Sequence, residues 1–206
     1  MALNLITSSA VLSYTPYGIA FDGKCLYVTD YDNKLIKKYD SDFTLIRTSG
    51  VLSSNFNDVA FDGKYLYVAD YNNKGIKKYD RNFNLIRTSL LNNRPCGITF
   101  NGKYIYVADF SSNAVILLYD MTVPVLANNL TYSPRGLAFD GKYFYVVDYT
   151  NQVIKKYDSN FFYSGVGVVV RTSGALGYSP LGIAFDGKYF YVADETNKVI
   201  KKYTWT

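Results

Sequence analysis

Apolar and polar positions alternate in short runs along the whole chain, and the same succession of runs returns five times. Each copy opens with a run like Gly-Ile-Ala-Phe and an Asp-Gly or Asn-Gly pair. It continues with runs like Lys-Tyr-x-Tyr-Val-Ala-Asp and Ile-Lys-Lys-Tyr-Asp, and most copies close with a run like Phe-x-Leu-Ile-Arg-Thr-Ser. Such runs, rich in β-branched and aromatic residues and bounded by turn residues, are typical of strands. The pattern therefore predicts four antiparallel strands in each copy, with no helical period.

The spacing of the copies predicts the architecture. The phenylalanine that ends the first run recurs at intervals of 40, 39, 39 and 46 residues, at Phe21, Phe61, Phe100, Phe139 and Phe185. Four strands every 40 or so residues are typical of a propeller blade. We expect an all-β, five-bladed β-propeller as one domain over residues 1–206. The expected blades cover residues 17–49, 57–89, 96–127, 135–173 and 182–206. The Asp-Gly and Asn-Gly pairs predict tight type I′ hairpins.

The ring needs one more strand. The last copy ends at Thr206 without its fourth run, whereas residues 3–8 match residues 43–49, the fourth run of the first copy. Residues 3–9 are therefore predicted to complete the last blade, which removes the exposed edges of an open ring.

Composition excludes several kinds of chemistry. The 206 residues contain no histidine, so a Ser-His-Asp system and an imidazole-ligated metal are excluded. The lysines of this mildly basic chain (net charge +5) are spread over all copies, which disfavours nucleic-acid binding. Cys25 and Cys96 occupy non-equivalent positions, so free thiols are expected. We expect no metal and no cofactor.

The expected location follows from two further absences in the sequence. No apolar run is long enough to span a bilayer, and the N-terminal segment lacks the features of a signal peptide. We therefore expect no membrane insertion and a cytoplasmic or particle-associated protein.

The copies resemble NHL-type and YVTN repeats. The resemblance rests on Tyr27-Val-Thr-Asp30 with Asn33-Lys34 and on its counterparts at 67–74, 106–113, 145–151 and 191–198. It covers almost the whole chain and implies a propeller fold. Propellers of this kind serve as protein-binding platforms, RNA readers, surface-layer proteins and, less often, enzymes, so the resemblance leaves the function open.

Some residues recur in every copy, and a structural role is favoured for them. The aspartates that end the second strand are expected to accept backbone N–H bonds, the alternative being a ring of carboxylates for a cation; they are Asp30, Asp70, Asp109, Asp148 and Asp194. The turn lysines and the pairs 37–38, 77–78, 155–156 and 201–202 are expected to form a solvated edge, the alternative being a surface for anionic ligands. The repeated tyrosines are expected to pack between blades with their hydroxyls near the edge of the propeller; they are Tyr27, Tyr67, Tyr106, Tyr145 and Tyr191.

A candidate binding surface lies where the copies differ. The loops into the innermost strand and those between the second and third strands share one face of a propeller. They are predicted to present a partner-binding loop face of aromatic and charged residues: Tyr17, Tyr31, Asp58, Tyr71, Arg94, Phe110, Arg135, Tyr149 and Glu195. Ordinary loop variation is the competing interpretation.

A second candidate surface is an apolar flank. The third copy replaces the lysine pair with Leu117-Leu118, and the fourth carries about six extra residues around Phe161, Phe162 and Tyr163. Exposed apolar area of this kind marks an interface, so this flank is predicted to bind a partner or another copy. The alternative is that the insertion folds back and buries the two leucines.

Together these features favour a non-catalytic interaction or structural propeller that presents its loops and apolar flank to a protein partner or to itself, within a larger surface or virion assembly. A multivalent, lectin-like propeller that binds glycans is the main alternative. An RNA-binding NHL-type module and a glycoside hydrolase are weaker ones. For the hydrolase, Asp58 and Glu195 could form the carboxylate pair, but no supporting constellation surrounds them.

Overall fold

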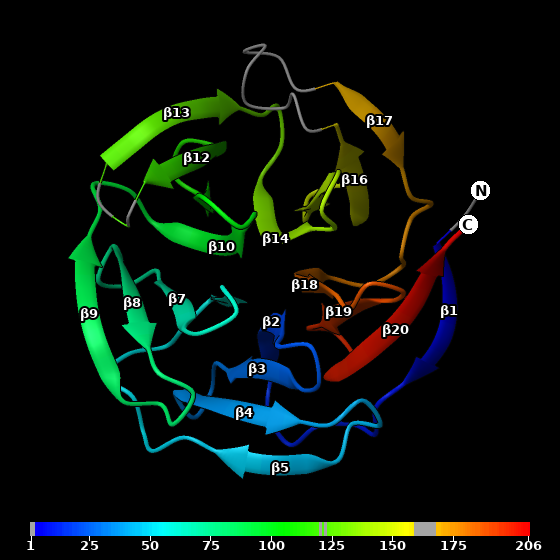
Figure 1. Ribbon diagram of the computed structural model, residues 1–206. Helices are drawn as coiled ribbons and strands as arrows, with labels where there is room; N and C mark the ends of the chain where they lie inside the picture. The colour runs from blue at the N-terminus through cyan, green and yellow to red at the C-terminus, as the bar shows by residue number, and fades with distance from the viewer. Residues whose placement is uncertain (1–2, 120, 122, 159–167) are drawn as a thin grey trace.

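The protein is a ring of five four-stranded antiparallel sheets around a central axis (Figure 1). This computed structural model describes residues 3–119, 121, 123–158 and 168–206. The predicted all-β, five-bladed propeller is confirmed. Within the described ranges no helix is long and apolar enough to cross a membrane.

Each blade consists of four strands that follow one another outward from the axis. Blade 1 contains β2 (Pro16–Phe21), β3 (Leu26–Asp30), β4 (Leu35–Tyr39) and β5 (Leu45–Thr48). Blade 2 contains β6 (Asp58–Phe61), β7 (Leu66–Asp70), β8 (Gly75–Tyr79) and β9 (Leu85–Leu90). Blade 3 contains β10 (Pro95–Phe100), β11 (Ile105–Asp109), β12 (Ala114–Tyr119) and β13 (Val123–Asn129). Blade 4 contains β14 (Pro134–Phe139), β15 (Phe144–Asp148), β16 (Val153–Tyr157) and β17 (Val169–Thr172).

Blade 5 joins the two ends of the chain, as predicted. Its strands are β18 (Pro180–Phe185), β19 (Phe190–Asp194), β20 (Val199–Trp205) and β1 (Leu3–Ser8). β1 pairs with β20 in a register that sets Leu3 opposite Trp205 (Figure 1). Ser9 continues the ladder, because its N–H donates to the Ile200 carbonyl at 2.9 Å and its hydroxyl accepts the Ile200 N–H at 2.9 Å.

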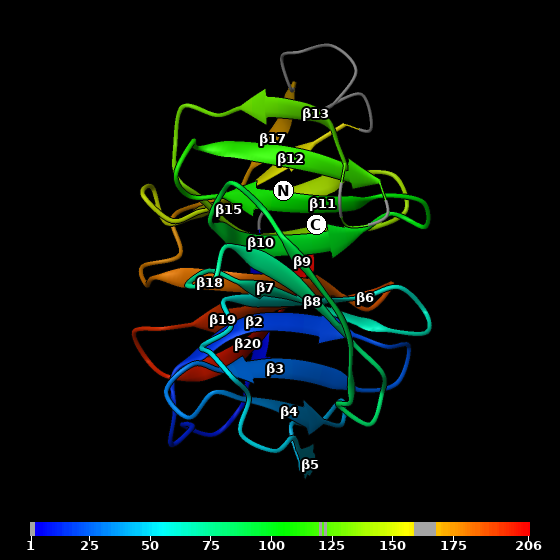
Figure 2. The same ribbon diagram turned by 90° about the vertical axis from the view of Figure 1, so that its left-hand side faces the viewer.

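The core is divided among the blade interfaces. Five clusters of buried apolar side chains each join two neighbouring blades. Figure 2 shows the sheets stacked face to face in this way. The repeated tyrosines lie in these clusters, and their hydroxyls bond to the turns. Tyr27, for example, donates to Asp22 at 3.0 Å, which confirms the predicted packing.

The hairpins between the first and second strands differ from the predicted type I′ turns. Phe21 pairs with Leu26, which leaves a four-residue loop, and of Asp22 and Gly23 only Gly23 has a positive φ (91°). The Asp22 carboxylate accepts the N–H groups of Lys24 and Cys25 at 3.0 and 2.7 Å. This side-chain-to-backbone bonding stabilises an Asx-type loop in place of the two-residue turn.

Candidate functional site

The loops at one end of the inner strands bring eight of the nine predicted loop-face residues into one continuous band, which we call the rim. Tyr17 stacks on Tyr31, with ring centroids 4.3 Å apart. Tyr149 donates to Glu195 at 3.3 Å. Burial and the nearby Glu195 carboxylate raise the pKa of Tyr17 to about 12, so its hydroxyl stays neutral at physiological pH. The predicted gathering of these side chains is therefore found.

Two arginines connect the other half of the rim. Arg135 lies over both Phe110 and Tyr149, with its guanidinium carbon 4.4 and 5.1 Å from the ring centroids. Arg94 lies 5.3 Å from the Tyr71 ring centroid, and Tyr71 packs edge-on against Phe110 at 6.1 Å. Cation–π contacts of this kind hold a guanidinium in a fixed orientation while leaving its N–H groups able to bind other acceptors.

Arg135 carries an unused donor. Its Nε is buried, and among the described residues no acceptor bonds to it. A buried N–H without a partner is costly, so it is normally satisfied by another group. The rim therefore offers a guanidinium that lies between two rings and is suited to bind an anionic oxygen.

The ninth predicted residue, Asp58, does not belong to the rim. It is 1% exposed and lies on the axis of the ring, where its carboxylate accepts the N–H groups of Val59 and Ile98, both at 2.9 Å. The N–H groups of Ile19 and Leu137 also act on its pKa, so one side chain interacts with the inner strands of four blades. Burial raises the pKa of this carboxyl well above its usual range, while the four N–H groups act to lower it.

The other blades explain why Asp58 lies so deep. They carry Gly18, Gly97, Gly136 and Gly182 at the equivalent position, and their inner strands come close together there. A Cβ on Gly18 would lie 2.3 Å from the Asp58 Cα, and one on Gly97 would lie 1.8 Å from the Arg135 carbonyl oxygen. The glycines thus leave room for one side chain on the axis. Asp58 and Glu195 therefore do not form a pair of facing carboxylates.

A small cavity of about 90 Å³ follows Asp58 along the axis. It is lined by three successive residues of each inner strand: 19–21, 59–61, 98–100, 137–139 and 183–185. Thr99 stands there where the other four blades have alanine, so the lining of the cavity differs in blade 3.

The repeated aspartates have the structural role that was predicted. Asp30 accepts the Asn33 N–H at 2.9 Å, and the same bond recurs in blades 2, 4 and 5. No group of three or more His, Cys, Asp or Glu side chains that could hold a metal ion is found in the part of the chain that the structure describes.

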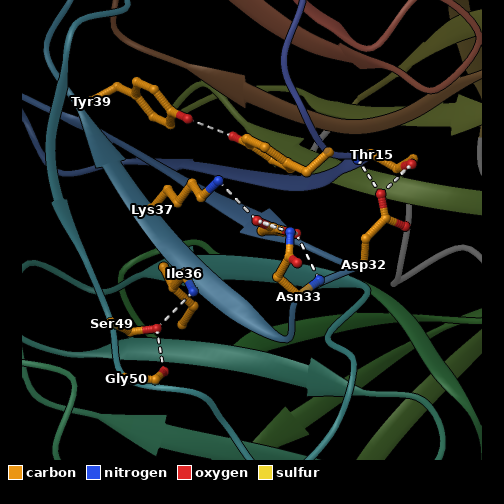
Figure 3. Close-up of polar contacts among 10 residues, drawn as sticks. Thr15, Asp32, Asn33, Ile36, Lys37, Tyr39, Ser49 and Gly50 are labelled. Carbon is orange, nitrogen blue, oxygen red and sulfur yellow. Dashed lines mark hydrogen bonds and ion pairs between the residues drawn. The ribbon is translucent and has the colours of Figure 1, made fainter.

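The first lysine of each pair, in contrast, does not lie on the predicted solvated edge. Lys37 donates to the Asp30 carboxylate at 2.9 Å (Figure 3), and the equivalent lysines of blades 2, 4 and 5 donate to the equivalent aspartates. Lys77 is the most buried, with 7% exposed. The ammonium neutralises an aspartate that is itself fully buried, which explains why it is drawn inward.

Replacing Lys77 by Met is expected to cost about 3 kcal/mol of unfolding free energy near pH 7, because it leaves the Asp70 charge buried without its cation. Burial alone would raise the pKa of Asp70, but hydrogen bonds from Lys77, Ser54 and Asn73 outweigh it and lower the pKa. A lowered folded pKa stabilises the protein above the unfolded pKa, and this contribution is lost as the pH falls through the folded pKa.

The cost of Lys77→Met should therefore be smaller at about pH 3 than at pH 7, because pH 3 lies below the ordinary aspartate pKa of about 3.9 and protonation removes the charge that Lys77 balances. Urea unfolding at both pH values measures it. Lys24→Met, at an exposed turn lysine, is the control and should have little effect. A cost that is equal at the two pH values would contradict this account.

The apolar flank differs from its prediction. Leu117 and Leu118 are 2% and 1% exposed and pack into the clusters on opposite faces of blade 3, so they form no exposed surface. The register also shows that Ile116 and Leu117, not Leu117 and Leu118, occupy the lysine positions, because Val107 and Tyr106 pair with them. Phe161, Phe162 and Tyr163 lie outside the described residues.

Exposed apolar side chains do occur, on the outermost strands. Leu5, Ile6, Leu45 and Ile46 are each at least half exposed, and blade 2 repeats the pattern at Leu85 and Ile86. This surface was not predicted from the sequence, because these runs were assigned to fourth strands without regard to which of their side chains are exposed. The polar residues that follow the two apolar ones in each run, such as Arg47 and Thr48, were the available signal.

These features define a five-bladed β-propeller with a rim of aromatic and charged side chains on its loop face. Residues 55–74, 95–117 and 181–200, in blades 2, 3 and 5, match the model of the LVIVD repeat. Three of the five blades thus contain segments similar to the LVIVD repeat, and the resemblance of the chain to NHL and YVTN repeats stays a prediction. A search of curated proteins finds no match.

Several solved structures share the fold. Glutaminyl cyclase from Myxococcus xanthus is 12% identical, with a TM-score of 0.82 and 98% of this chain and 95% of that chain covered. Hydrazine synthase from Kuenenia stuttgartiensis is 22% identical, with a TM-score of 0.58 over 89% of this chain and 56% of that chain. Virginiamycin B lyase from Staphylococcus aureus is 16% identical, with a TM-score of 0.58 over 93% of this chain and 66% of that chain. At these identities the likeness is one of fold alone.

Proposed function

We propose that the protein is a non-catalytic interaction module that binds a protein partner through the rim. The observation that carries the proposal is Arg135, whose guanidinium lies between Phe110 and Tyr149 and whose Nε has no acceptor among the described residues. Arginine and tyrosine at the centre of a patch are the side chains that most often dominate binding between proteins. This arginine would donate hydrogen bonds to a carboxylate of the partner, on a side chain or at a C-terminus.

A non-catalytic role agrees with the position of the acidic residues. The Asp58 carboxylate is occupied by backbone N–H groups, and Glu195 is bonded by Tyr149. Neither is placed beside the other as glycoside cleavage by paired carboxylates requires.

Replacing Arg135 by Ala is expected to weaken binding of a rim ligand by about 30-fold or more, the effect typical of a central anchor. The ligand is first obtained by selecting peptides from a displayed random library on the wild-type protein, and affinities are then measured by calorimetry. Arg81→Ala is the matched control, because Arg81 lies over the ring of Phe61 at 4.7 Å, outside the rim. Selected peptides should carry a carboxylate and bind Arg81→Ala normally. Equal binding to Arg135→Ala would refute the proposal.

A second candidate, a lectin-like propeller, is favoured by one repeated feature. Tyr65, Tyr143 and Tyr189 each lie between two lysine ammonium groups, at 4.0 and 4.9 Å in the case of Tyr65. Partly exposed rings repeated around a disc could bind one sugar each and gain strength through multivalency. Binding to a glycan array that survives Arg135→Ala but is lost on Tyr143→Ala would favour this candidate over the rim.

A further inference from the structure

A cavity lies between blades 2 and 3, and its lining residue Asn93 is the chain neighbour of the rim residue Arg94. Its volume is about 410 Å³, which is within the usual range for small-molecule sites of about 300–1,000 Å³. The end of β9 and the segment after it supply one wall, and residues of β11 to β13 supply the other. Val107, Ile116 and Leu118 make it apolar on one side, while Asn93 and Ser112 make it polar on another.

The equivalent space in blade 1 is filled by side chains of the protein itself. Tyr14 lies there, with its hydroxyl 2.7 Å from that of Tyr39 and its ring centroid 3.7 Å from the Lys37 ammonium. The same ammonium donates to Asp30 at 2.9 Å (Figure 3). An aromatic ring and an ammonium group thus occupy this position together, beside a buried carboxylate.

The arrangement recurs in three other blades. In blades 4 and 5 a Tyr–Tyr hydroxyl contact and a Lys–ring contact repeat at 2.7–2.8 Å and 3.6–3.7 Å. In blade 2 the ring is that of Phe56, which packs against Tyr79 and lies 5.2 Å from the Lys77 ammonium. Ring and ammonium are therefore present in four of the five blades.

Blade 3 has lost all three side chains. By register, Ile116 replaces the lysine and Leu118 the tyrosine of the third strand, while Asn93 stands where Tyr14 stands in blade 1. Each replacement is smaller than the residue it replaces or lacks its polar group. The cavity therefore lies where the ring and the ammonium lie in the other blades.

The carboxylate, however, remains. Asp109 is fully buried, and its Oδ2 accepts the Asn93 amide at 2.6 Å and the Ser112 hydroxyl. In blade 2 the same oxygen of Asp70 accepts Ser54, Asn73 and, in addition, the Lys77 ammonium. Within the described ranges no lysine or arginine forms an ion pair with Asp109. A buried negative charge is thus left beside a cavity, with only neutral side chains between them.

We propose that this cavity binds a small molecule in which an aromatic ring carries a short alkyl chain with a primary ammonium group. The ammonium donates to the oxygens of Asn93 and Ser112, directly in front of the Asp109 charge, whose attraction is strong in this weakly polarisable interior. The ring lies against Val107, Ile116 and Leu118. The ligand thus supplies the ring and the cation that the chain supplies in the other blades. None of the eight rim side chains lines this site.

Tyramine is the probe, and 4-ethylphenol, which has the same ring without the ammonium group, is its neutral counterpart. Calorimetric titration at pH 7 should give one tyramine site with a dissociation constant in the millimolar range or tighter, as expected for a ligand of this size. Binding of 4-ethylphenol should be at least about tenfold weaker. Absence of saturable tyramine binding, or equal affinity for the two compounds, would overturn the proposal.

Ile116→Lys restores the lysine of the other blades and should weaken tyramine binding at least about tenfold, because the new ammonium neutralises Asp109. Ile46→Lys makes the same change at a position 55% exposed on β5 and should leave binding unchanged. If Ile116→Lys fails to fold, Asn93→Tyr tests the same point by placing a ring in the cavity. Undiminished tyramine binding in a folded variant of either kind would also overturn the proposal.

Discussion

Deletion of residues 1–10 is expected to lower the melting temperature by about 10–20 °C. The truncation removes β1 and the Ser9 bonds, and it leaves the edge of β20 without its partner. At about 1 kcal/mol for each ladder hydrogen bond, the loss of a strand of this length amounts to about 5 kcal/mol. For a chain of this size, each kcal/mol corresponds to about 2–4 °C. Most β1 side chains are exposed, so the loss comes mainly from the backbone.

Calorimetry of the truncated and full-length chains measures this effect. The control is a circular permutant in which a short linker joins Thr206 to Met1 and the chain begins at Val11. It keeps every residue of β1, and because Leu3 faces Trp205 the linker only has to form a hairpin turn. It should melt close to the wild-type protein. A truncated chain that melts within a degree or two of wild type would show that β1 does not stabilise the ring.

Replacement of Asp58 by Asn is expected to cost about 3–5 kcal/mol, because several buried N–H groups lose an acceptor and the new amide N–H₂ faces donors. Asp58→Ala should be at least as costly, since it leaves the N–H groups of four blades without this acceptor. Both variants disrupt the same hydrogen bonds, so both should have a lower free energy of unfolding than the wild-type protein.

Guanidinium unfolding at neutral pH measures the two variants. Asp32→Asn makes the same chemical change at an exposed aspartate whose hydrogen bonds within the described residues go to Thr15, and it should cost less than about 1 kcal/mol. If Asp58→Asn were no more costly than Asp32→Asn, the carboxylate on the axis would not stabilise the contact between the inner strands.

The fold could be predicted from the sequence because it rests on periodicity. The lengths and spacing of the strands repeat in every copy, and residues 3–9 match the fourth run that the last copy lacks. The ring and its closure by β1 could therefore be recognised without any coordinates. The rim could be predicted for the same reason, since the loop face follows from strand order alone.

Side-chain depth could not be predicted in this way. The sequence predicts Asp58 on the loop face because it lies where the loop enters the innermost strand, yet the glycines of the other blades leave room for its side chain on the axis. The sequence places Leu117 and Leu118 at the lysine positions of blade 3, one residue too far along the strand, because this run is one residue longer than in the other blades. The cavity between blades 2 and 3 depends on Asn93, Ile116 and Leu118, which come together only in the folded ring.

The single carboxylate on the axis also limits how regular such a protein can become. A ring of five identical copies with aspartate would bring five negative charges onto one point, and a ring with five glycines would leave that point without any acceptor. One odd copy supplies an acceptor to its own inner strand and to those of three other blades, so the stable ring is an asymmetric one. A consensus sequence averaged over the blades would erase that difference, and designs based on this scaffold should keep one aspartate and four glycines.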